Sequence, residues 1–167
     1  MIRHGWDAVV RGIHWLVAAL FYTNYFLTEV GEWWHRKIGW AILCLLALRI
    51  IWGLTAARGP NRLASFTPSR RAWRAHWREL CTRQTPPTVG HNPAGAVAIY
   101  LMWLGLAAAA LSGWLQDTDW GIDHSVDDWH QWITKAVFWL TMVHLSAVVM
   151  VSWRLRKNLI RAMLRGQ

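Results

Sequence analysis

Cysteine and acidic residues are scarce in this chain of 167 residues. It has two cysteines, and nine acidic residues stand against eighteen basic ones. Cys44 lies in an apolar run and Cys81 in a basic stretch, so no disulfide is expected between them. The absence of a CxxCH motif excludes covalent attachment of a c-type haem. The length is that of one domain, and neither an internal repeat nor a low-complexity segment divides it.

Apolar runs, in contrast, dominate the chain, which is 54% hydrophobic and has 15 tryptophans. Residues 94–115 form a run of 22 without a charge, long enough to cross a bilayer as a helix. Three further runs are interrupted only by isolated polar residues. We therefore predict an all-α membrane protein, a four-transmembrane-helix bundle in a single domain (1–167), with helices at about 11–29, 34–54, 93–116 and 126–153 and a cytoplasmic loop over 55–92. A start of the first helix nearer Asp7 stays open. No small-residue cleavage site follows this helix, so we expect it to be retained.

The distribution of charge predicts the orientation. The N-terminal stretch, the loop over 55–92 and the tail after residue 153 hold fourteen basic residues and only two acids, Asp7 and Glu79. The other two connections are acidic, with Glu29, Glu32, Asp117, Asp119, Asp123, Asp127 and Asp128. Basic segments stay on the cytoplasmic side, so both termini are expected in the cytoplasm of a multi-pass membrane protein. The high net charge is thereby explained without nucleic-acid binding.

An amphipathic pattern lies within the long loop. In the stretch 70–80, Trp73, Trp77 and Leu80 follow one helical stripe, while Arg70, Arg74 and Arg78 follow another. This pattern is typical of a helix lying on a membrane, with aromatic residues among lipid headgroups. We expect such an interfacial helix between the second and third spans, with a solvated loop helix as the alternative.

Four histidines form two pairs when the helices are placed across a membrane. His130 and His144 are fourteen residues apart, so they point to nearly the same side of one helix, about 21 Å apart. His35 lies at the outer end of the second helix, and His14 near the inner end of the first. Depth therefore pairs His35 with His130, and His14 with His144. Facing imidazoles at two levels favour two bis-histidine haems, because haem iron accepts axial imidazoles and helix bundles build cofactor sites from facing helices.

Two other residues of the second helix fit this interpretation. Arg49 is fourteen residues beyond His35, at the inner level, where a haem propionate is a natural partner for a charge within a span. Snorkelling to the headgroups is the alternative. Gly39 lies one turn from His35 and leaves room for a porphyrin, although small residues also serve helix packing. Lys135 is expected to face away from the axis between the haems, since it is about 140° around the helix from His130.

Motifs along the whole chain resemble those of the bacterial cytochrome b561 family, which includes the cytochrome b subunit of nickel–iron hydrogenases. The similar segments are "RGIHWLVAALF", "EWWHRKIGWAILCLLALRIIWG", "GHNPAGA" and "WHQWITKAVFWLTMVHLSAVV". The resemblance implies two haem b groups bound by His14, His35, His130 and His144. It also implies a place in a bacterial inner membrane and electron transfer between a periplasmic redox partner and the quinone pool. The "HNPAGA" stretch is similar to the branch that often has a c-type cytochrome as partner.

Whether the chain is itself an enzyme stays open. A quinone, as an exchangeable substrate, would need an apolar cleft with polar groups, and the candidates are His91, Asn92 and Arg49 inside, and Lys135 and Trp129 outside. His91 is equally well explained as a plain loop histidine. One alternative function is a superoxide–ubiquinone oxidoreductase, which the acidic outer connection disfavours. A haem-free transporter or assembly factor is the other, and it leaves the paired histidines unexplained.

Overall fold

The computed structural model describes residues 6–66, 70, 73–74, 77–78, 93–156 and 158–166. Every regular element in these ranges is a helix. The long helices are α1 (Ala8–Phe26), α2 (Trp33–Thr55), α4 (Pro93–Leu115) and α6 (Val126–Leu155). The short ones are the 3-10 turns η1 (Gly59–Asn61) and η2 (Leu63–Phe66), and the helices α5 (Asp119–Asp123) and α7 (Leu159–Arg165).

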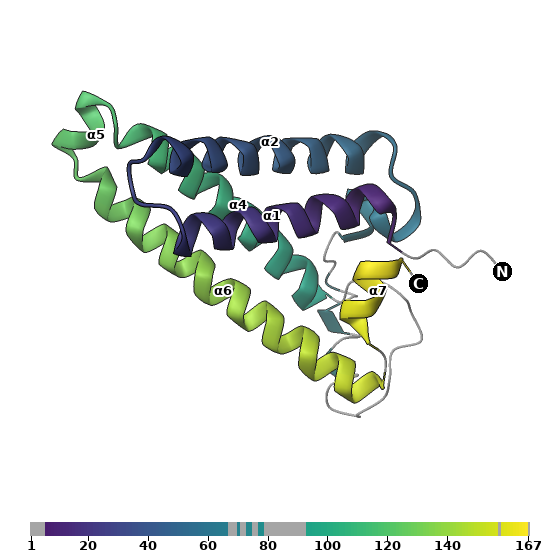
Figure 1. Ribbon diagram of the computed structural model, residues 1–167. Coiled ribbons are helices and arrows are strands. Elements are labelled where there is room, and N and C mark those ends of the chain that lie inside the picture. The colour runs from purple at the N-terminus through teal and green to yellow at the C-terminus, as the bar shows by residue number, and fades with distance from the viewer. Residues whose placement is uncertain are drawn as a thin grey trace.

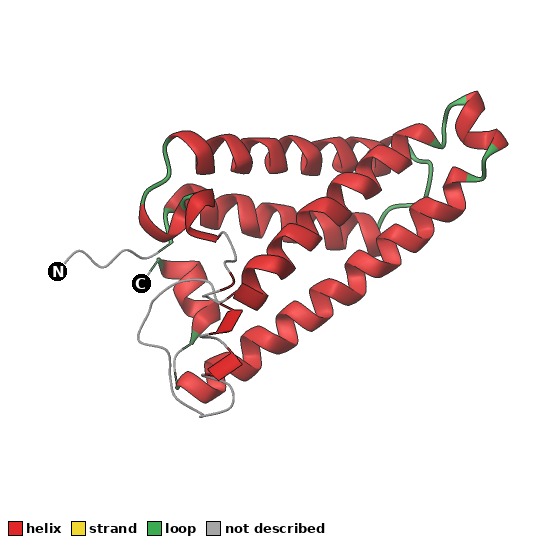
Figure 2. Cartoon of the chain, turned by 180° about the vertical axis from the view of Figure 1, so that it is seen from behind, coloured by secondary structure: helices red, strands yellow, loops and turns green. Residues whose placement is uncertain are grey.

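The four long helices form one elongated bundle. Helix α1 packs against α2, α2 against α4, and α4 against α6. Helix α5 lies at one end of the bundle, and the start of α1 and helix α7 lie at the other (Figure 1). The same arrangement is visible from behind (Figure 2). The bundle therefore has one end that carries the acidic connections and one that carries the basic termini.

Three helices in the described part of the chain are long and apolar enough to cross a membrane: Trp33–Thr55, Pro93–Leu115 and Val126–Arg154. In each of these helices, only 6 to 22% of the most apolar 18-residue stretch is buried inside the protein. Their exposed surface carries large apolar side chains such as Leu104 and Trp139. In water such a surface would be an association site, whereas lipid solvates it directly. The protein is thus an all-helical, multi-pass membrane protein.

Helix α1 begins and ends earlier than the predicted 11–29. The Asp7 carboxylate accepts a hydrogen bond of 2.7 Å from the backbone N–H of Val10, so Asp7 is the N-cap and the helix starts at Ala8. At its other end the chain leaves the helix after Phe26. Its 19 residues span about 28 Å, and it carries polar residues such as Arg11 and Asn24; it is not among the three helices that are both long and apolar enough to cross a membrane.

The two shortest helices, α5 and α7, were not predicted from the sequence. Both carry a capping signal that is readable in retrospect. The Thr118 hydroxyl accepts from the Gly121 backbone N–H at 3.1 Å, and the Asn158 side chain accepts from Arg161 at 2.8 Å. Gly166 then ends α7 in a left-handed conformation with φ of 75°.

The buried core lies midway between the two levels of histidines. It comprises Phe21, Ile42, Leu46, Leu106 and Val137. Phe21 is seven residues beyond His14, and Val137 is seven from both His130 and His144. Seven residues are close to two helical turns, so these side chains project on the same side as the histidines. An apolar layer therefore separates two polar levels inside the bundle.

Candidate functional site

The outer pair of histidines is assembled by α2 and α6. The ring centres of His35 and His130 lie 6.1 Å apart, and their planes are inclined at 71°. His35 is half-buried, and His130 is buried at 8% exposure. The two residues that depth alone paired at the outer level are therefore neighbours in the structure.

Hydrogen bonds fix the ring of His130. Its Nδ1 atom lies 3.0 Å from the carbonyl oxygen of Ala109 and 3.1 Å from the hydroxyl of Ser112, both on α4. A ring nitrogen facing a carbonyl must carry the proton, so Nδ1 donates and Nε2 keeps a free lone pair. Gly113 lies next to them, and a Cβ built there would be 3.1 Å from Cε1 of His130. The glycine leaves the room that the imidazole occupies.

The ring of His35 is held in the same manner from the other side. Its Nδ1 atom lies 3.0 Å from the hydroxyl oxygen of Thr28. That hydroxyl lies 2.8 Å from the carbonyl oxygen of Asn24 and 2.9 Å from its side-chain oxygen, and it donates its one proton to them. The oxygen of Thr28 therefore accepts from Nδ1 of His35, and Nε2 again keeps its lone pair.

This geometry fits an iron held between the rings. A metal bonded at about 2 Å to two imidazoles puts their ring centres about 6 Å apart, which agrees with the separation of His35 and His130. Metal-binding histidines generally donate their other N–H to a carbonyl or hydroxyl partner, as both rings do here. The described residues contain no group of three or more His, Cys, Asp or Glu side chains suited to a metal ion. Two imidazoles suffice for haem, because the porphyrin supplies the other four nitrogens.

The inner pair, His14 and His144, is less firmly held than the outer pair. His14 on α1 and His144 on α6 lie within electrostatic range of each other. The His14 side chain is exposed and that of His144 half-buried. His14 has one ring neighbour, Trp15, edge-on at 5.2 Å between centres. Among the described residues, neither inner imidazole has a hydrogen-bond partner, in contrast to the outer pair.

Arg49 is buried at the basic end of the bundle, at 4% exposure. It donates to the carbonyl oxygen of Asn61 at 3.0 Å, and its guanidinium lies 5.5 Å from the ring centre of Trp103. Asn61 also accepts from the backbone N–H of Asp7 at 3.2 Å, and Asp7 in turn accepts from the Trp52 indole at 3.1 Å. The charge therefore does not snorkel into solvent, and a polar network joins it to the start of α1.

The remaining candidates are more dispersed. A Cβ built on Gly39 would meet nothing within 4 Å, so space adjoins α2 one turn from His35. Lys135 is exposed, with its ammonium 5.3 Å from the ring centre of Trp132. His91 and Asn92, considered for a quinone site, lie outside the described residues.

The end of the bundle near α5 carries acidic and aromatic groups together. Trp120 is stacked on His124 at 4.2 Å and lies edge-on to Trp129 at 6.4 Å between ring centres. Both tryptophans are about half exposed. Arg36 at the start of α2 binds Asp117 at 3.1 Å, which neutralises one of the few basic residues there. The other aspartates on this end are all exposed: Asp119, Asp123, Asp127 and Asp128.

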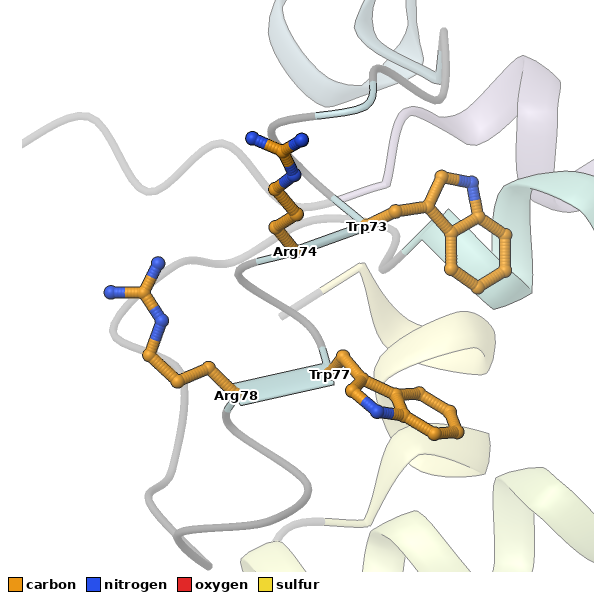
Figure 3. Close-up of a pocket in the computed structure, with 4 residues that line it drawn as sticks. All are labelled: Trp73, Arg74, Trp77 and Arg78. Carbon is orange, nitrogen blue, oxygen red and sulfur yellow. The ribbon is translucent and has the colours of Figure 1, made fainter.

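The predicted amphipathic stretch is helical at each described position, namely Arg70, Trp73, Arg74, Trp77 and Arg78. The last four line an open surface groove of about 580 Å³. The two indoles project to one side and the two guanidinium groups to another (Figure 3). This separation is the one expected for a helix at a lipid surface.

Facing imidazoles inside a bundle of apolar helices are the arrangement by which membrane haem proteins hold their cofactor. The chain belongs to the prokaryotic cytochrome b561 family, whose model matches residues 5–166, and the predicted family is thus confirmed. Membership implies a membrane cytochrome b that binds haem b and transfers electrons. Comparisons with curated proteins and with solved structures gave no significant match.

Proposed function

We propose that this cytochrome moves electrons across a bacterial inner membrane through two bis-histidine b haems. His35 and His130 would hold the outer haem, and His14 and His144 the inner one. The 6.1 Å separation of His35 and His130, with both Nδ1 atoms engaged and both Nε2 atoms available, carries the proposal. The inner pair would lie about 21 Å deeper along α6, at the level of His144, without the Nδ1 hydrogen bonds of the outer pair.

The topology follows from the same arrangement. Helix α1 is taken as the fourth span because it packs along α2 and carries one member of the inner pair. The basic termini lie at one end of the bundle and the acidic connections at the other, so the basic end faces the cytoplasm. Residues 70–80 would then lie on the cytoplasmic membrane surface, and the whole chain forms one cytochrome domain.

The residues determine what kind of redox chemistry is possible. When bound, haem supplies a one-electron couple. With two imidazoles holding each haem iron, no position would be left for oxygen or peroxide, and the haems would serve electron transfer alone. The Nδ1 hydrogen bonds of His35 and His130 orient the rings and raise their basicity. The buried guanidinium of Arg49 would compensate an inner propionate, and the space beside Gly39 would admit the outer porphyrin.

We propose two redox partners for this cytochrome, one within the membrane and one outside it. A quinone is proposed as the membrane-side substrate, and a periplasmic redox protein, of which a c-type cytochrome is one class, as the outer partner. Exposed Trp120 and Trp129 amid aspartates suit a protein with a basic surface. The same aspartates would repel superoxide, so this charge distribution does not favour a superoxide oxidoreductase.

Absorption spectroscopy with haem quantification tests this function. The purified protein should show a reducible low-spin b-type spectrum and two haems per chain. The full-length protein in detergent, expressed with adequate haem supply, is the sample, and its spectrum is compared with that of a His130→Ala variant. One haem in the variant supports the proposal, whereas no haem in the parent protein would overturn it.

A further inference from the structure

Helix α7 is attached at both of its ends to different long helices. At its start, the backbone N–H of Leu159 donates to the hydroxyl of Ser152 on α6 at 3.2 Å. At its end, the carbonyl oxygen of Leu164 accepts from the Arg11 guanidinium on α1 at 2.7 Å. The Trp15 indole also lies 3.4 Å from the carbonyl oxygen of Met163. Helix α7 therefore bridges α1 and α6, and Figures 1 and 2 both show it between them.

The contact with α1 is closely fitted. Arg11 and Trp15 are four residues apart, so they project from adjacent turns on one face. Both donate to carbonyl oxygens in the last turn of α7, which lack partners within the helix. Gly166 follows with φ of 75°, and a Cβ there would lie 3.0 Å from the Arg11 guanidinium carbon. A larger residue at 166 would be strained and would press on Arg11.

The inner histidines lie between two ties that join α1 to α6. One tie is the hydrogen bond of 2.9 Å between the hydroxyls of Tyr22 and Thr141, near the middle of the bundle. The other is α7. His14 stands between Arg11 and Tyr22 on α1, and His144 stands between Thr141 and Ser152 on α6. Since neither inner imidazole has a hydrogen bond among the described residues, the spacing of these helices sets the position of the rings.

We propose that α7 is a brace that fixes the separation of α1 and α6 and thereby positions the inner histidine pair. Arg11, Trp15 and Gly166 are positioning residues in this arrangement, and they act on the inner pair only. The outer pair lies on α2 and α6, and its rings are held by hydrogen bonds from α4 and the turn after α1, none of which involves α7, so we expect it to be independent of the brace. The inference rests on the proposed function, because it takes His14 and His144 as haem ligands.

Three variants test the brace in the full membrane protein: deletion of residues 158–167, Arg11→Met, and Gly166→Val. Arg165→Met is the matched control, because Arg165 is exposed on α7 and makes none of these contacts. Haem per chain and the electron paramagnetic resonance signals of the two oxidised haems are measured. In the three variants, retention of the inner haem should weaken about tenfold or its signal should shift, as expected when outer-shell support is lost. The outer signal and the control should stay as in the parent.

The outcomes separate the brace from the ligand assignment. If the deletion fails to assemble, Arg11→Met and Gly166→Val decide, since each keeps the chain complete. Inner signals and haem content identical to the parent in these variants would overturn the brace. His14→Ala is measured in parallel. If it removes one haem while the brace variants do not, the brace alone is wrong; if it leaves two haems, the ligand assignment is wrong.

Discussion

The hydroxyl of Thr28 accepts a hydrogen bond from Nδ1 of His35 at 3.0 Å, joining the turn after α1 to the first turn of α2. The bond makes the imidazole a stronger donor to iron, which favours the oxidised haem. Thr28→Ala should therefore raise the midpoint potential of the outer haem, and Thr28→Ser should restore it. A spectroelectrochemical titration measures both haems in one sample.

Ser112→Ala provides the control for this prediction. His130 also donates to the Ala109 carbonyl at 3.0 Å, which the substitution leaves in place. The outer potential should consequently move less than in Thr28→Ala. A larger shift in Ser112→Ala, or a shift confined to the inner haem, would contradict the assigned hydrogen bonds.

Gly39 offers a test of where the outer porphyrin lies. A Cβ built there meets no atom of another helix within 4 Å, so Gly39→Leu should leave the fold of the haem-free protein intact. If the porphyrin occupies that space, the variant should lose outer haem selectively, measured as haem per chain. Gly12→Leu is the matched control, since Gly12 is equally uncrowded and lies about 200° around α1 from His14. Equal haem contents in the two variants would refute the placement.

The sequence predicted that His35 and His130 would be neighbours, but not the groups that hold their rings. Depth along the helices was sufficient to place His35 beside His130, because a helix has a fixed rise per residue. The contacts of His130 with Ala109 and Ser112 depend on how α4 is rotated against α6, which a nearly uniform apolar helix does not encode. The end-on contact of α7 with Arg11 is similarly tertiary, although the capping residue Asn158 marked the start of that helix.

Arg49→Leu should lower the midpoint potential of the inner haem. The buried positive charge favours the reduced haem over the oxidised one. Its removal should therefore lower the midpoint potential by roughly 50 mV, equivalent to about 1 kcal/mol for a one-electron couple. Arg49→Lys keeps the charge and should retain most of the potential. Since Arg49 also binds the carbonyl of Asn61, thermal stability is measured alongside. An unchanged inner potential in a stable Arg49→Leu protein would exclude the propionate contact.

The acidic outer end should govern docking of the periplasmic partner. Asp127 and Asp128 are exposed beside Trp129, so replacing both with Asn should slow haem reduction by a basic partner protein such as a c-type cytochrome. The parent rate should fall as salt rises, because screening sets in at about 10 Å in 0.1 M salt. Stopped-flow reduction measures both effects. Glu29→Gln with Glu32→Gln, on the other outer connection, is the charge-matched control. Rates that are insensitive to salt and to the aspartates would contradict this docking surface.

Haem quantification in paired histidine variants tests the central claim most directly. A double variant His35→Ala/His130→Ala removes both residues of the pair whose rings lie 6.1 Å apart, and it should keep one haem per chain. A double variant His35→Ala/His14→Ala removes one residue from each pair and should keep none. The expected result is therefore one haem per chain in the first double variant and none in the second. One haem in both double variants, or none in the first, would contradict pairing by depth.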